Sequence, residues 1–385
     1  MSEYQYYEFQ AVDRPLTQEQ MGELRVYSSR ARITPSSFVN EYNWGDFKGD
    51  PDKWMEKYFD AFLYLANWGS RWLMLRVPKT LLDPDTALAY CTGEKLSCRA
   101  KGDYIILSFD SEEEEYEWSE GEGWLASLIP LRADVMRGDH RCLYLGWLLG
   151  VQSGELDDVT LEPPVPPGLG DLNAPLGSFA DFLRIDHDLI SAAAEQSAKG
   201  ADFGLSDDDI AKWVADLSLK DKGAFLMKMI GGDYPHAAAE LRQRALSEIH
   251  GAREAGGDLR KSERRSVGQL IARAEVITEE RRKREAERAA LEKARREQEQ
   301  AKNRKQYLES LVNKESGLWA KVDKLIATKQ PKRYDEAISL LQDLHDLAEF
   351  KGKNTEFSLR MSTLHSEHMR KPALVNKFRK AKLLS

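Results

Sequence analysis

Cysteine is scarce in this chain of 385 residues, and long apolar runs are missing. Three cysteines are an odd number and too few for a disulfide framework, so we expect a reducing cytoplasm. The longest apolar stretch, residues 143–151, is about half of the roughly 20 residues that a membrane-spanning helix needs. The first residues lack the basic start and apolar segment of a secretion signal. The sequence therefore predicts a cytoplasmic protein without a membrane partner.

Patterns of catalysis and cofactor binding are missing as well. The sequence has no glycine-rich phosphate loop, no G-x-S-x-G and no H-E-x-x-H. Cys91, Cys98 and Cys142 form no C-x-x-C pair. His365 and His368 lie three residues apart without a third ligand nearby, so a solvated pair is favoured over a metal site. We expect no catalytic residue, no cofactor and no metal, and we favour a protein that is not an enzyme.

Charge is divided unevenly along the chain, although the net charge is only −8. Residues 1–170 hold 16 basic and 29 acidic residues, whereas residues 251–385 hold 32 basic and 21 acidic residues. Seven of the nine tryptophans lie before residue 150. An acidic, Trp-rich front half and a basic rear half indicate separate modules with different partners, or modules that attract each other.

The first 110 residues read as alternating strands and helices. Thr17 is a helix N-cap with Gln20 at the capping-box position. The Asn67–Ser70 segment has hairpin-turn chemistry between two strand-like runs, and a second hairpin is expected around Gly102. This order predicts an α+β domain, an antiparallel sheet with helices of ferredoxin-like type or an elaboration of it.

A loop of Gly, Asp and aromatic residues over 44–52 is the first candidate interaction site. Trp44 and Phe47 could anchor a protein partner, and Asp46 lies between them. The alternative is a tight connection whose aromatic side chains fold back onto the core, and we favour it. A calcium loop is excluded because the 12-residue ligand pattern and its closing Glu are missing.

A dense acidic run over 110–122 is the second candidate. It holds eight acidic residues in 13 positions, so the favoured interpretation is a solvated loop and the alternative is a docking strip for a basic surface. Its candidate contact residues are Glu112, Glu113, Glu114, Glu115 and Trp118.

Four prolines and two glycines within residues 162–171 predict a semi-rigid linker. After the linker the sequence is helical. The predicted organisation is an acidic, Trp-rich α+β domain ending in a helical pair (1–161), a Pro/Gly linker (162–175), a helical domain (176–260), a long charged helix (261–313), and a helical hairpin with a basic tail (314–385).

The long charged helix carries a basic stretch over 281–305, with eleven basic and five acidic residues. Leu291 is its one large apolar residue between Thr278 and Gln306, so the sequence lacks the repeating apolar positions that a coiled coil needs. A solvated helix stabilised by Glu–Arg pairs is expected instead. Phosphate binding is the alternative, although no aromatic residue is present to stack on bases. The candidate nucleic-acid contacts are Arg281, Arg282, Lys283, Arg284, Arg288, Arg295 and Arg296.

Three blocks of sequence resemble a family of uncharacterised bacterial proteins. They are residues 4–16, residues 38–50 and the late helix that opens Arg333-Tyr-Asp-Glu-Ala337. The resemblance reaches both ends of the chain and implies no established activity. More loosely, the chain resembles an accessory protein of a type III CRISPR system with a guided protease, which would imply a role in antiphage defence.

These observations favour a bacterial, cytoplasmic interaction or scaffold protein that binds one or more proteins of the same complex. The alternative is a nucleic-acid-associated accessory protein that uses the basic stretch.

Overall fold

The computed structural model describes residues 3–112, 120–199, 207–231 and 264–383, together with seven positions between 237 and 248. The described chain divides into two compact units, Met1–Arg281 and Arg282–Ser385. We call them the head unit and the C-terminal unit. In the part of the chain that is described, no helix is both long enough and apolar enough to cross a bilayer.

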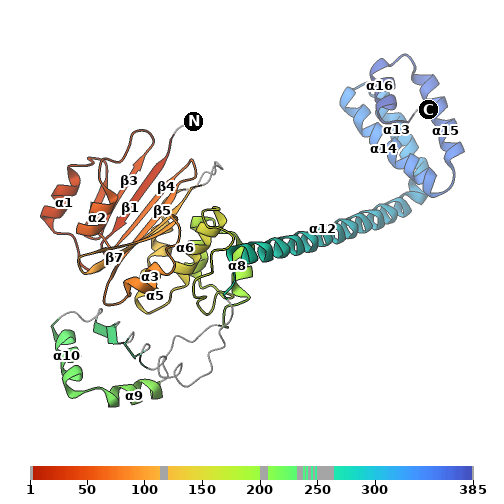
Figure 1. Ribbon diagram of the computed structural model, residues 1–385. Helices are drawn as coiled ribbons and strands as arrows, with labels where there is room; N and C mark the ends of the chain where they lie inside the picture. The colour runs from red at the N-terminus through yellow and green to blue at the C-terminus, as the bar shows by residue number, and fades with distance from the viewer. Residues whose placement is uncertain are drawn as a thin grey trace. The chain divides into compact units, whose positions relative to one another are not determined.

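The head unit is built on one antiparallel sheet, shown in Figure 1 with its helices. Its seven described strands follow the order β2-β3-β1-β4-β5-β7-β6. The strands are β1 (Gln5–Gln10), β2 (Arg32–Thr34), β3 (Ser37–Tyr42), β4 (Ala61–Ala66), β5 (Arg71–Pro78), β6 (Leu96–Lys101) and β7 (Tyr104–Ser111).

The first four strands have ferredoxin-like connectivity. They join with α1 (Gln18–Arg25) and α2 (Pro51–Lys57) in the order β1-α1-β2-β3-α2-β4, and they lie side by side as β2-β3-β1-β4. The expected α+β class with an antiparallel sheet is therefore confirmed. The elaboration is a second β-α-β-β unit, β5-α3-β6-β7, in which α3 (Pro84–Leu88) connects β5 to the far edge of the sheet.

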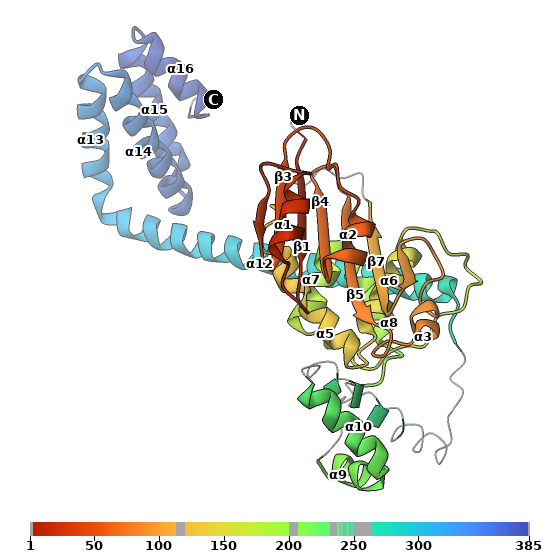
Figure 2. The same cartoon turned by 90° about the vertical axis from the view of Figure 1, so that its left-hand side faces the viewer.

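Helices cover both faces of the sheet (Figures 1 and 2). Strands β1 and β5 run parallel to each other, because each is antiparallel to β4. The connection from β1 through α1 leads to β2 at one edge of the sheet, and the connection from β5 through α3 leads to β6 at the other edge. Because such crossovers are right-handed, the two helices lie on opposite faces of the sheet. Leu24 of α1 accordingly packs with Phe9, whereas Ala87 of α3 packs with Leu75 on the other side.

The thicker layer lies on the α3 side and consists of helices from the second half of the head unit. Alternate strand residues such as Leu63 and Leu107 pack against it. The helices that contribute to this core are α4 (Trp124–Leu128), α5 (Pro130–Met136), α6 (Arg141–Gln152), α7 (Ala174–Leu183), α8 (His187–Ala194) and the start of α12 (Val267–Leu311). Two further helices, α9 (Asp207–Asp216) and α10 (Leu219–Ile230), complete the described part of this unit.

The proline-rich segment that we expected to be a linker is packed into the head unit. Glu162 and Leu169 are buried, and Leu161 forms a β-bridge with Ser266. The division between the compact units instead falls at Arg281/Arg282, within α12. Proline fixes the backbone of this segment, but long-range contacts keep it against the core.

The C-terminal unit is helical throughout its described residues, which confirms the second part of the expected fold class. Trp319, Leu341, Phe357 and Phe378 belong to its core. Its elements after α12 are η1 (Val312–Lys314), α13 (Glu315–Ala327), α14 (Pro331–Phe350), α15 (Asn354–His368) and α16 (Pro372–Lys380).

Candidate functional site

The loop between β3 and α2 places its two candidate aromatic residues, Trp44 and Phe47, in different surroundings. Trp44 is 78% exposed. Phe47 instead packs into the core beneath α1 and α2, and its ring stacks on Tyr7 at a centroid distance of 4.7 Å. Phe47 therefore folds back onto the core, as the favoured alternative predicts for this loop. Trp44 does not, and its ring remains available to a partner.

The base of this loop is fixed by hydrogen bonds as well as by packing. Gln5 Nε2 donates to the carbonyl oxygen of Gly45 at 3.1 Å, and the Tyr7 hydroxyl donates to Gln5 Oε1 at 2.8 Å. Burial raises the pKa of Tyr7, so its hydroxyl stays protonated and keeps donating. Gly45 has φ 83°, which a residue with a side chain rarely adopts. Trp44 is thus presented from an ordered backbone.

Beside Trp44 lies a hollow of about 430 Å³. Tyr27 and Tyr42 line it together with Trp44, and polar side chains form its floor. There Asn40 Nδ2 donates to Ser28 Oγ at 3.1 Å. We call the hollow and the three aromatic residues Tyr27, Tyr42 and Trp44 the Trp44 surface.

Four charged residues complete the wall of the hollow. They are Arg30, Glu41, Asp46 and Lys48. The wall is neutral overall, so binding there would use aromatic contact and individual charges rather than a strong field of one sign.

The acidic run begins at the same end of the sheet as the Trp44 surface. Gln5 of β1 pairs with Tyr42 and with Ala66, and Arg71 of β5 pairs with Ser111, so the ends of β3, β4 and β7 form one edge. Glu112 follows β7 and is exposed. The other candidates of this run, Glu113, Glu114, Glu115 and Trp118, lie outside the described residues.

Three carboxylates lie near Tyr4, namely Glu41 near the end of β3 and Glu120 and Glu122 of the acidic run. Burial raises the pKa of Tyr4, and the negative charges of Glu41, Glu120 and Glu122 raise it further. Three exposed carboxylates of this edge therefore lie near the same tyrosine hydroxyl.

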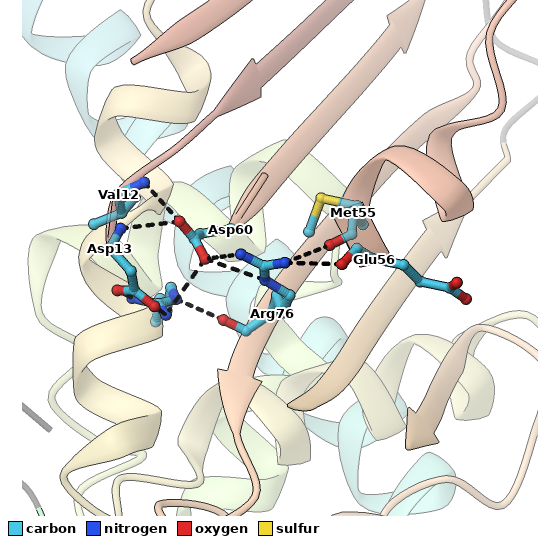
Figure 3. Close-up of polar contacts among 7 residues, drawn as sticks. Val12, Asp13, Met55, Glu56, Asp60 and Arg76 are labelled. Carbon is cyan, nitrogen blue, oxygen red and sulfur yellow. Dashed lines mark hydrogen bonds and ion pairs between the residues drawn. The ribbon is translucent and has the colours of Figure 1, made fainter. Parts of the chain in front are cut away.

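A buried charged cluster in the head unit is the strongest polar constellation that sequence reasoning missed (Figure 3). Asp60 and Arg76 form an ion pair at 2.7 Å. The backbone amides of Val12 and Asp13 donate to Asp60 Oδ2 at 2.7 and 2.9 Å. Arg132 donates to the carboxylate of Asp13 at 2.9 and 2.6 Å.

This cluster is saturated with protein partners. Arg76 Nη1 donates to the carbonyl oxygens of Met55 and Glu56, and Arg132 Nε donates to the carbonyl oxygen of Arg76. Burial alone would raise the pKa of Asp60, but the arginines and backbone amides hold it below its ordinary value. Such a cluster joins β4, β5 and α5 and supports the fold; it offers no acid, base or open ligand position. The signal in the sequence is Arg76 itself, a charge inside the otherwise apolar run 72–77.

A second buried cluster holds the proline-rich segment. Arg265 donates to both carboxylate oxygens of Glu162 at 2.9 and 2.8 Å, and the Tyr144 hydroxyl also bonds to that carboxylate. Burial raises the pKa of Tyr144, which keeps its hydroxyl a donor. This cluster fixes the chain just before α12 begins.

The predicted nucleic-acid residues lie on α12, in two different settings. Arg281 forms an ion pair with Asp188 at 2.9 Å, and the hydrogen bond from Arg281 holds the pKa of Asp188 below its ordinary value. Arg296 pairs with Glu292 at 2.6 Å, as a solvated helix predicts. The remaining candidates, Arg282, Lys283, Arg284, Arg288 and Arg295, are exposed.

Among the described residues, the one cluster of potential metal ligands and the thiolate of Cys142 have little support as functional groups. His345, Asp346 and Glu349 have potential ligand atoms within 4.8 Å of one another, but Arg304 already binds Asp346 at 2.6 Å and its positive charge opposes a cation there. Burial raises the pKa of Cys142 and disfavours its thiolate.

No family model matches the chain, and neither the curated proteins nor the solved structures include a match.

Proposed function

We propose that the protein is a non-enzymatic interaction protein, an adaptor or scaffold that binds one or more protein partners through the Trp44 surface. The observation that carries this proposal is a tryptophan 78% exposed on a loop whose base is fixed by Phe47 and Gln5. A rigid aromatic anchor loses little conformational entropy on binding, and tryptophan is enriched among residues that dominate binding energy.

The proposal is tested by affinity capture of the tagged full-length protein from its native host, with nuclease-treated and untreated halves. Wild type, Trp44→Ala and Val159→Ala are compared, because Val159 is also exposed but lies outside the Trp44 surface. We expect a protein partner that survives nuclease, that is retained by Val159→Ala and that falls about tenfold or more with Trp44→Ala. Equal capture by wild type and Trp44→Ala would contradict the proposal.

The identity of the captured protein also tests the expectation of a role in antiphage defence. A component of a CRISPR system would support that expectation, and a partner from an unrelated process would contradict it.

A second proposal, nucleic-acid binding by α12, is supported by the spacing of its basic residues. Arg288, Arg295 and Lys302 recur every seven residues and are exposed, so they lie on one side of the helix. Glu285, Glu292 and Glu299 recur at the same interval and reduce the positive field, which makes this the weaker proposal. It predicts that the full-length protein binds random duplex DNA with an affinity that falls steeply with salt. Absence of binding at low salt would contradict it.

A further inference from the structure

The edge of the sheet that carries the Trp44 surface also carries an excess of exposed carboxylates. The exposed carboxylates are Glu41 near the end of β3, Asp46 in the loop that follows β3, and Glu112, Glu120 and Glu122 in the connection from β7 to α4. The strand register brings these connections to one end of the sheet.

Basic residues near this edge are fewer and partly paired. Arg32 reaches Glu122 at 4.0 Å. Arg30 and Lys48 line the hollow itself. Neither Glu41 nor Asp46 has an ion-pair partner among the described residues. Two carboxylates beside the exposed aromatic rings are therefore available to an incoming cation.

Aromatic faces and carboxylates together form the chemistry that recognises guanidinium and ammonium groups. A cation over a Trp or Tyr ring is attracted by the ring quadrupole, and a nearby carboxylate adds a charge-assisted hydrogen bond. Tyr27, Tyr42 and Trp44 provide the rings, and Glu41 and Asp46 provide the carboxylates.

We propose that the partner binds this acidic edge through a segment rich in Arg or Lys, and that one cationic side chain of the segment occupies the hollow beside Trp44. This inference rests on the proposed function. The wall of the hollow is neutral, but the described edge around it adds Glu112, Glu120 and Glu122, so charge complementarity with the edge as a whole selects this occupant. The acidic surroundings repel the phosphates of a nucleic acid, and the hollow has space for a side chain.

The test measures fluorescence anisotropy of a labelled peptide with the full-length protein. The probe is a peptide of about 12 alternating Arg and Ala residues, and its matched control has Gln in place of every Arg. We expect the Arg peptide to bind at least about tenfold more tightly than the Gln peptide, with affinity that falls as salt rises from about 50 to about 300 mM. Equal binding of the two peptides would overturn the inference.

Variants of the protein test whether the Arg peptide binds at the hollow. Trp44→Ala and the double variant Glu41→Gln/Asp46→Asn should each weaken the Arg peptide about 3- to 30-fold, whereas Val159→Ala should leave it unchanged. Thermal unfolding of each variant confirms that it is folded. If all of these variants bind the Arg peptide with the affinity of wild type, the peptide binds elsewhere and the inference is overturned. Binding of a labelled single-stranded DNA that depends on Trp44 would also overturn it.

The two proposals can fail separately. If the host partner depends on Trp44 but the Arg peptide does not bind, the adaptor function stands and the basic partner is wrong. If no partner depends on Trp44, the adaptor proposal fails whatever the peptide does.

Discussion

Two ion pairs of nearly equal length show how differently this protein uses charge. Arg76 and Asp60 lie 2.7 Å apart with side chains 2% and 0% exposed, whereas Arg296 and Glu292 lie 2.6 Å apart with side chains 73% and 63% exposed. Distance does not distinguish these pairs, but their surroundings do. Water screens the second pair, while the first pair has given up its hydration and depends on its protein partners.

The comparison separates residues that maintain the fold from residues that can meet a partner. The partners of the buried pair come from the connection after β1, from α2 and from α5, so the pair supports the fold. The exposed charges and Trp44 contribute little to stability, and they are the groups that another molecule can reach.

The largest expected effect is on the buried cluster. Asp60→Leu leaves Arg76 and Arg132 buried without their shared carboxylate, and it should lower the free energy of unfolding by about 3–5 kcal/mol. The double variant Asp60→Leu/Arg76→Met should recover much of this loss, because no unpaired charge remains at that position. Urea denaturation measures both variants, and a double variant no more stable than Asp60→Leu would break the argument.

The cluster that anchors the proline-rich segment should have a smaller effect. Glu162→Gln removes the charge that pairs with Arg265 but keeps the size of the side chain, so we expect a loss of about 1.5–3 kcal/mol. Urea denaturation followed by tryptophan fluorescence measures the loss, because most tryptophans lie in the head unit. An unchanged midpoint would mean that this segment behaves as the free linker that its prolines suggested.

As the pH falls, exposed carboxylates of ordinary pKa should be protonated before Asp60, because the pKa of Asp60 lies below its ordinary value. The pKa of Asp60 in the folded protein is below its ordinary value, so its stabilisation is complete above the unfolded pKa of about 3.9 and is lost as pH falls through the lower folded pKa. The stability difference between wild type and Asp60→Asn should therefore be constant near neutral pH and shrink below about pH 4. A difference that shrinks between about pH 5 and 7 would contradict the assigned direction.

The smallest expected effect is that of the exposed tryptophan on stability. Trp44→Ala should change the free energy of unfolding by less than about 0.5 kcal/mol, because the ring makes little buried contact. Phe47→Ala is the matched comparison, and it should destabilise the protein clearly, since Phe47 packs on Tyr7 and Trp54. Thermal unfolding measures both variants. Equal losses of stability would contradict the conclusion that Phe47 packs in the core and Trp44 does not.

Local patterns predicted most of the head unit's elements. The Thr17 side chain accepts a hydrogen bond from the Gln20 backbone amide, and the Gln20 side-chain oxygen accepts one from the Thr17 backbone amide, as the capping box requires. The expected hairpin turn at Gly102 has φ 54°, which suits glycine. Strand order was out of reach because it depends on partners distant in sequence, such as Gln5 with Tyr42 and Ala66.

The candidate site was predicted only in part. Composition identified the loop over 44–52, but whether an aromatic side chain folds inward depends on neighbours such as Tyr7, which the loop sequence does not contain. The same limit applies to the proline-rich segment, whose buried Glu162 is held by a residue 103 positions away. Within the expected helical domain, the chain forms two helices, α7 and α8, where Arg184 adopts φ 56° between them.

The most direct test applies one substitution to both ion pairs. Urea denaturation of Arg76→Met and of Arg296→Met compares the same chemical change at nearly equal pair distances. Arg76→Met should lose about 3–5 kcal/mol of unfolding free energy, and Arg296→Met should stay within about 0.5 kcal/mol of wild type. Similar losses of unfolding free energy in the two variants would contradict the central claim. That claim is that buried charges stabilise the fold, whereas exposed charges contribute little to stability and can be reached by a partner.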